Sequence, residues 1–71
     1  QQMKPIHLSP IELKCVAFMA EGYPATRIAA LMNMDLTAVL TLESDIIRKF
    51  NGHNRFQAVA KAVLMGFVSS D

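Results

Sequence analysis

The side chains best suited to covalent or metal chemistry in this chain are one cysteine and two histidines. Cys15 could act as a nucleophile, and His7 and His53 could transfer protons or bind a metal ion. The two histidines stand far apart, with no cysteine or carboxylate at ligand spacing, and Cys15 lies in an apolar segment typical of a buried structural thiol. No nucleophile, base and orienting group can be assembled. We therefore expect no metal site, no cofactor and no enzymatic activity.

Composition narrows the class of protein further. The 71 residues include seven Lys+Arg and six Asp+Glu, a formal charge of +1, which is not the strongly basic balance of a protein that coats nucleic acid. A hydrophobic content of 52% excludes a disordered tail. A single cysteine excludes an internal disulfide framework and favours a reducing, cytoplasmic compartment. The longest apolar run has six residues, Cys15 to Ala20, and is too short to cross a membrane.

Local signals predict the elements that position these side chains. Ser9, Pro10 and Glu12 form a capping box with proline at the first helical position, and Gly22 is a left-handed stop for the helix that follows. Asn54 is a cap before the last helix. No segment alternates with period two, so no strands are expected. The predicted helices span residues 10–21, 24–32, 36–50 and 55–65.

Apolar residues recur at helical spacing in all four segments and predict a common core. The expected inward positions are Leu13, Val16 and Ala20; Ile28, Ala29, Leu31 and Met32; Val39, Ile46, Ile47 and Phe50; and Ala58, Val59, Ala62 and Val63. Further apolar residues exceed what so small a monomer can bury, which favours self-association. These are Cys15, Phe18, Met19, Ala60, Leu64, Met65, Phe67 and Val68.

The fold class that follows is all-α, a four-helix bundle containing a helix-turn-helix. A short turn at residues 33–35 joins the second and third helices, as that motif requires. We expect an N-terminal arm or linker remnant at 1–8, one domain at 9–68 and a C-terminal tail at 69–71.

Five segments resemble the LuxR-type (GerE-like) helix-turn-helix domain of bacterial transcription regulators. They are LSPIEL from Leu8, AEGY from Ala20, RIAAL from Arg27, IIRKF from Ile46 and NRFQAVAKA from Asn54. The resemblance covers about residues 8–68. It implies a bacterial, cytoplasmic, DNA-binding domain whose third helix enters the major groove and whose fourth helix makes a dimer contact. It also implies a sensing or receiver domain, as in response regulators or quorum-sensing regulators, that is missing from this chain.

The third helix departs from that family where bases are read. Leu40 and Leu42 stand where Lys and His are usual, and residues 36–45 contain no Lys, Arg or His. Glu43 is expected to approach the polyanion. The base-facing residues implied are Leu40, Thr41 and Ser44. The phosphate contacts implied are Arg27, Thr37, Arg48, Lys49 and Arg55. The dimer interface implied is Val59, Val63 and Leu64.

Two alternatives remain open at this point. The missing cations also fit a protein-interaction module that has weakened or lost DNA binding, pairs with another regulator, and presents Leu36, Leu40 and Leu42 to a partner helix. Arg48 and Lys49 could instead bind the last carbonyls of their own helix.

Overall fold

The computed structural model describes residues 6–68, which form four helices and no strand. The helices are α1 (Pro10–Ala20), α2 (Ala25–Met32), α3 (Leu36–Lys49) and α4 (Arg55–Leu64). The all-α prediction is confirmed, and the predicted helix ends differ by one residue at most, within the usual ambiguity of helix termini. The tail predicted at 69–71, and residues 1–5 of the predicted arm, lie outside the described residues.

The capping signals act as predicted at three helix ends. Ser9 Oγ accepts from the Glu12 amide at 3.2 Å, and the Ser9 amide donates to Glu12 Oε1 at 2.8 Å, which completes the capping box of α1. Asn54 Oδ1 accepts from the Gln57 amide at 2.9 Å and begins α4. Gly22, with φ +91°, permits the sharp turn that follows α1.

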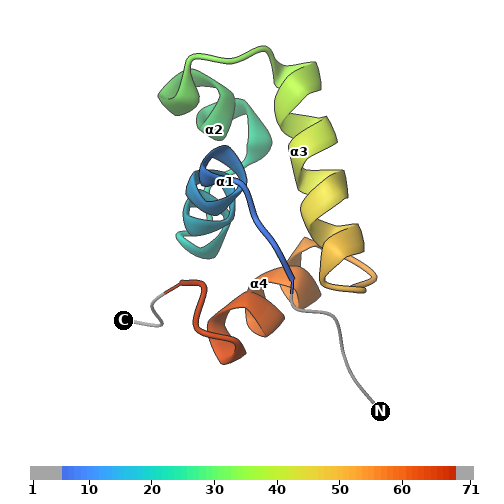
Figure 1. Ribbon diagram of the computed structural model, residues 1–71. Coiled ribbons are helices and arrows are strands. Elements are labelled where there is room, and N and C mark those ends of the chain that lie inside the picture. The colour runs from blue at the N-terminus through green and yellow to red at the C-terminus, as the bar shows by residue number, and fades with distance from the viewer. Residues whose placement is uncertain (1–5, 69–71) are drawn as a thin grey trace.

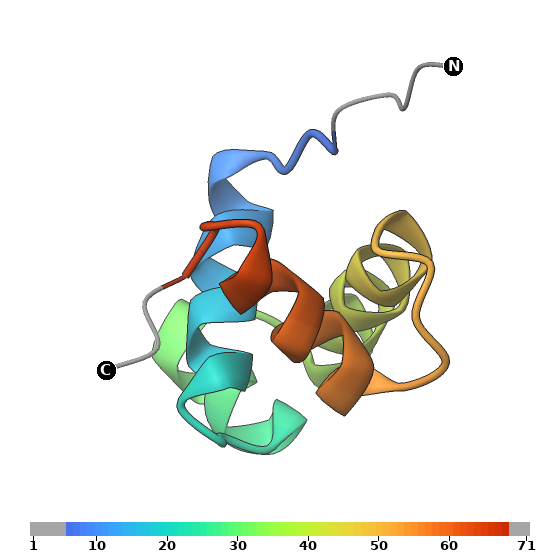
Figure 2. The same cartoon turned by 90° about the horizontal axis from the view of Figure 1, so that it is seen from below.

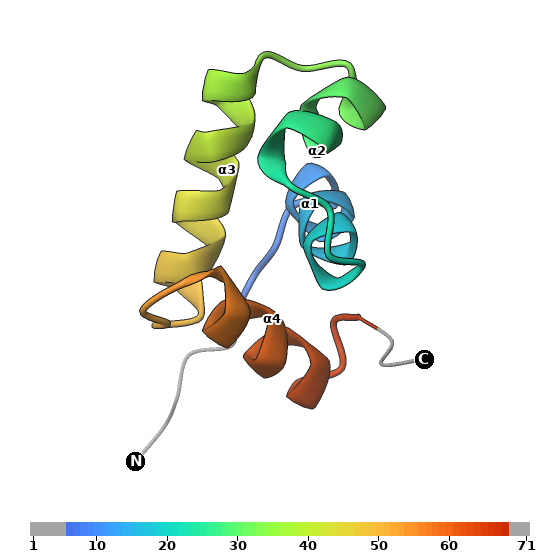
Figure 3. The same cartoon turned by 180° about the vertical axis from the view of Figure 1, so that it is seen from behind.

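Helices α1 and α3 connect the fold, since each packs against the other three helices. Within residues 6–68, α2 and α4 do not contact each other. Figure 1 shows α3 along one side of the molecule, α2 above α1, and α4 crossing beneath. Figure 3 shows the same order from behind. Seen from below in Figure 2, α4 lies across both α1 and the end of α3.

The core contains the predicted residues of α3 but a different face of α1. Val39, Ile46 and Phe50 are buried, and the Phe50 ring meets Phe67 edge-on with centroids 5.5 Å apart. Of the predicted inward residues of α1, Val16 is buried as expected, but the prediction is wrong for Leu13 and Ala20, which are exposed. The buried positions of α1 are Glu12, Cys15, Val16 and Met19.

The error in α1 has a simple physical reason. Apolar residues lie almost all around this helix, so its pattern does not say which side faces inward. Cys15 and Met19, expected to be surplus surface, belong to the core. On α2, Leu31 is likewise exposed, while Ile28 and Ala29 are buried. None of the helices among residues 6–68 has the length and hydropathy needed to cross a bilayer.

Candidate nucleic-acid interface

The exposed residues on the outer side of α3 carry no charge from Leu36 to Ser44, and Arg48, four residues later and 76% exposed, adds a cation at the end of that side. Leu40 is 48% exposed, and Thr41 and Ser44 are exposed beside it. Leu36 and Thr37, one turn earlier, are also exposed, because positions four apart share one side of a helix. We use the term outer face for these residues: Leu36, Thr37, Leu40, Thr41 and Ser44.

A tight turn presents this face. Asn33 adopts left-handed backbone with φ 56° and ends α2, and the Met34 amide donates to the Ala29 carbonyl at 2.9 Å. Asp35 then precedes α3 as its N-cap residue, but its side chain makes no capping hydrogen bond. The turn leaves α3 packed against both α1 and α2, and the residues of the outer face remain exposed.

Glu43 is not part of this surface. Glu43 is buried, and its Oε2 lies 3.6 Å from Arg55 Nη1. The expectation that Glu43 approaches a polyanion is therefore wrong. It stands on the same side of α3 as Val39 and Ile46, four residues after one and three before the other. Glu43 Oε2 accepts no hydrogen bond among the described residues, so the Arg55 charge is its main compensation.

Arg55 also binds groups within the protein rather than facing solvent. Its side chain is 25% exposed, and Nη2 donates to the Tyr23 carbonyl at 2.6 Å, which ties the start of α4 to the α1–α2 connection. Arg27 lies over the ring of the same Tyr23, 5.5 Å from its centroid. Arg27 and Arg55 therefore contact the same residue, one at its ring and the other at its carbonyl.

Lys49 occupies a different end of the molecule. Its ammonium group donates to Glu12 Oε1 at 2.8 Å and to the His7 carbonyl at 3.0 Å, and so joins the end of α3 to the start of α1. Burial alone would raise the pKa of Glu12, but the hydrogen bonds from Lys49 and Ser9 outweigh burial and hold that pKa below its ordinary value.

The five predicted phosphate contacts therefore do not form one patch. Lys49 contacts Glu12 in the first turn of α1, whereas Arg55 contacts Tyr23 beyond its last turn, so most of α1, roughly 12 Å of helix, separates the two contacts. Arg48 is 76% exposed and pairs only loosely with Asp45, at 3.3 Å. Thr37 is exposed in the first turn of α3.

Two carbonyls just after α3 are bound by a residue that was not expected from the sequence. Lys61 Nζ donates to the carbonyls of Phe50 and Asn51 at 3.1 and 3.2 Å. The last carbonyls within α3 accept from backbone amides, and the side chains of Arg48 and Lys49 bind Asp45 and Glu12, so the alternative that these two residues bind the helix end is wrong. Asn51 has left-handed φ (56°), which directs the turn toward α4. The signal was present in the sequence as a lysine on the polar side of 55–65.

The three predicted dimer residues differ in exposure. Leu64 is 85% exposed, whereas Val59 and Val63 are half-buried and Val59 packs against the core. Phe56 and Met65, also exposed, extend the apolar surface of α4. Leu42, expected to be presented to a partner helix, is half-buried and packs against the core, so that part of the alternative is wrong.

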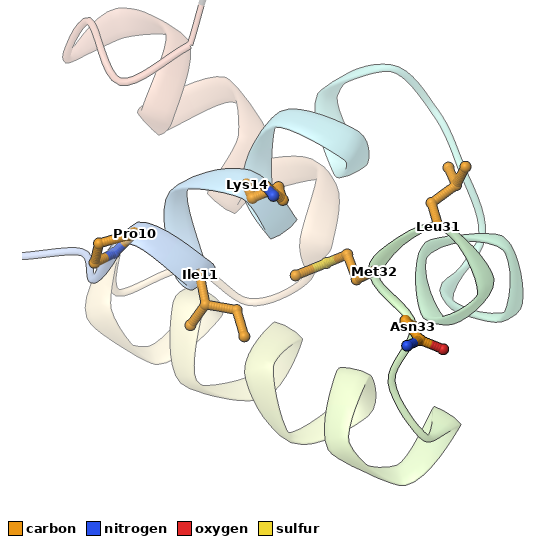
Figure 4. A pocket seen from close by; sticks show the side chains of 6 residues that line it. All are labelled: Pro10, Ile11, Lys14, Leu31, Met32 and Asn33. Atoms are coloured by element: carbon orange, nitrogen blue, oxygen red, sulfur yellow. The ribbon is translucent and has the colours of Figure 1, made fainter.

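The described surface also has a groove at the junction of two helices. The groove, of about 400 Å³, lies between α1 and the end of α2 (Figure 4). Its lining is Pro10, Ile11, Lys14, Leu31, Met32 and Asn33. Residues 6–68 hold no cluster of three His, Cys, Asp or Glu that could bind a metal ion. Burial raises the pKa of the Cys15 thiol to about 11, and the nearby Glu43 charge adds to this.

Comparison with known proteins finds similarity in sequence and in fold. A scan against models of protein families finds no match. The transcriptional activator protein VanR of Vibrio anguillarum is 36% identical over 62 residues, which are 87% of this chain and 26% of VanR. This chain thus spans about a quarter of the length of VanR.

A solved structure of the transcription factor GerE has the same fold. It superposes with a TM-score of 0.84 at 22% sequence identity, covering 90% of this chain and 96% of GerE. The match confirms the predicted four-helix arrangement with a helix-turn-helix. Neither similar protein is named as an enzyme, in agreement with the expectation from the sequence.

Proposed function

We propose that this chain is a LuxR/GerE-type helix-turn-helix domain that binds double-stranded DNA as part of a transcription regulator, with α3 as its recognition helix. The observation that carries the proposal is the exposed outer face of α3, held clear of α1 and α2 in the same arrangement as in the transcription factor GerE. VanR, a transcriptional activator, adds support from sequence.

In this proposal the outer face reads bases and nearby side chains contact phosphates. Leu40, Thr41 and Ser44 face the base edges. Arg27 and Arg48, exposed cations, and Thr37, in the first turn of α3, contact phosphates. Lys49 and Arg55 can contact a phosphate only if they break their hydrogen bonds to Glu12 and to the Tyr23 carbonyl. We therefore assign them a smaller contribution to DNA affinity.

A titration of duplex affinity against salt tests this proposal. Two to four phosphate contacts per monomer give a slope of log affinity against log salt near −2 to −4, doubled for a dimer. Arg48→Ala should make the slope shallower by about one unit. The control Lys14→Ala, an exposed lysine on α1, should leave it unchanged. Absence of any duplex affinity at low salt would overturn the proposal.

We also propose that α4 makes a homodimer contact through Val59, Val63 and Leu64. The support is the exposed apolar surface at the end of α4, where Leu64 and Met65 lie next to the half-buried valines. In sedimentation at high micromolar concentration the chain should form dimers, and Leu64→Lys should return it to monomers. Monomers in both cases would remove α4 as the contact.

A second function is favoured by one observation, the absence of any cation between residues 36 and 45 of α3. A protein-interaction module would use exposed Leu36 and Leu40 to bind a partner helix. Leu40→Lys separates the two functions. If the native chain lacks duplex affinity and the variant gains it, the native face serves protein contact. If the variant weakens an affinity that the native chain has, Leu40 already reads DNA.

A further inference from the structure

The outer face of α3 lacks the side chains that make bidentate contacts with bases. Guanine is most often bound by Arg or Lys and adenine by Asn or Gln. Among Leu36, Thr37, Leu40, Thr41 and Ser44 none of these four residue types occurs. The commonest ways of reading guanine and adenine in the major groove are therefore absent from this surface.

The outer face itself carries no carboxylate. A carboxylate in the groove could accept a hydrogen bond from cytosine N4. Glu43 is buried beside Arg55, and Asp35 is exposed but precedes α3 as its N-cap residue. None of the five residues of the outer face can therefore read cytosine through a carboxylate.

The hydroxyl groups of the outer face discriminate little between bases. Thr41 Oγ1 donates its hydrogen to the Thr37 carbonyl at 3.1 Å, so toward the groove it presents an acceptor oxygen and a methyl group. Ser44, one turn of the helix after Leu40, is a small hydroxyl that can pair with several bases. Neither residue distinguishes the four base pairs by itself.

What remains is apolar contact, and in the major groove only thymine carries an apolar group, its C5-methyl. Leu40, 48% exposed at the centre of the face, has the largest free apolar side chain there. We propose that Leu40 is a specificity-determining residue that reads thymine methyl groups, so that this domain selects thymine-containing steps by their methyls. This inference rests on the proposed DNA binding and names the chemistry of its target.

The experiment first selects duplexes from a random pool with the 71-residue chain at low salt. Each thymine of the enriched site is then replaced singly by deoxyuridine, which removes the methyl and keeps the base pairing. At the contacted thymines the affinity should fall about three- to fivefold, the effect of exposing one buried methyl-sized group. Replacements outside the contacted step should have no effect.

Protein variants test the same contact from the side of the protein. Leu40→Ala should bind the thymine and deoxyuridine duplexes equally, since the methyl no longer has a partner. The matched control Leu13→Ala, at a leucine of similar exposure (38%) on α1, should keep the full preference for thymine. The helical circular dichroism of both variants confirms folding, and the base replacement tests the native chain even if a variant unfolds.

The outcomes separate the two proposals. Duplex binding that is insensitive to deoxyuridine, or a preference for thymine that survives Leu40→Ala, overturns the methyl readout and leaves DNA binding intact. Absence of duplex affinity at low salt overturns DNA binding itself, and the methyl readout with it.

Discussion

The inner and outer sides of α3, a helix of fourteen residues, differ in what constrains their side chains. The inner side carries Val39, Ile46 and a buried carboxylate, and it contacts α1, α2 and α4. The outer face carries two leucines and three hydroxyls that contact solvent. Packing determines the inner side, where a change of one methylene is felt, whereas the outer face can change without unfolding the domain. Specificity for a partner therefore has to be sought on the outer face.

Truncation of one apolar residue on each side of α3 should give the largest difference in unfolding free energy between the two sides. Ile46→Ala, at a fully buried position, should lower the free energy of unfolding by about 3–4 kcal/mol. Leu40→Ala should lower it by less than about 1 kcal/mol, because its side chain is half-exposed. Urea unfolding followed by circular dichroism measures both, and Ile46→Val, with an expected loss of about 1 kcal/mol, covers the case in which Ile46→Ala does not fold. Equal losses at both positions would contradict the contrast.

The buried pair under α3 gives the next largest effect. Arg55→Ala leaves the Glu43 carboxylate buried without its cation and also removes the bond to the Tyr23 carbonyl, so we expect a loss of about 2–4 kcal/mol. Arg27→Ala, which removes only an exposed contact with the same tyrosine ring, should cost about 0.5–1 kcal/mol. If the two substitutions destabilise the chain equally in urea, Arg55 is not the structural cation inferred here.

The Glu12–Lys49 pair should give a smaller, pH-dependent effect. Because the pKa of Glu12 is lowered in the folded chain, its contribution is fully present above the ordinary carboxyl pKa of about 4.3 and is lost as the pH falls below that value. Glu12→Gln keeps an acceptor for the Ser9 amide but removes the charge. We expect it to cost about 1–2 kcal/mol at pH 7, since Lys49 is partly exposed.

The pH series carries its own control. The difference in unfolding free energy between the native chain and Glu12→Gln should shrink as the solution is acidified. Glu21→Gln, at an exposed position just after α1, should show little difference at any pH. A constant difference for Glu12→Gln down to strong acid would show that its charge does not contribute.

The sequence predicts those features of the structure whose interacting residues stand close together in the chain, and it does not predict the others. Helix ends were predictable because capping partners such as Ser9 and Glu12 stand three positions apart. The inward face of α1 was not, because that helix is apolar on nearly all sides. Burial of Glu43 depends on Arg55, twelve positions later on another helix, and no local pattern announces such a pair.

The candidate site was predictable in part for the same reason. Exposure of Leu40, Thr41 and Ser44 follows from helical spacing once the inner side is known. The engagement of Lys49 with Glu12, thirty-seven positions away, could only come from the assembled fold. Cations counted in the sequence as free for phosphate thus include two that hold the helices together.

Backbone and methyl NMR spectra of the labelled chain, recorded as a selected duplex is added, test the central claim most directly. If the outer face of α3 reads DNA, the largest shifts and the intermolecular contacts should occur at Leu36, Leu40, Thr41 and Ser44, with Val39 and Ile46 changing little. Shifts centred on α1 or α4 with the outer face unchanged, or spectra that do not respond to the duplex, would contradict the account.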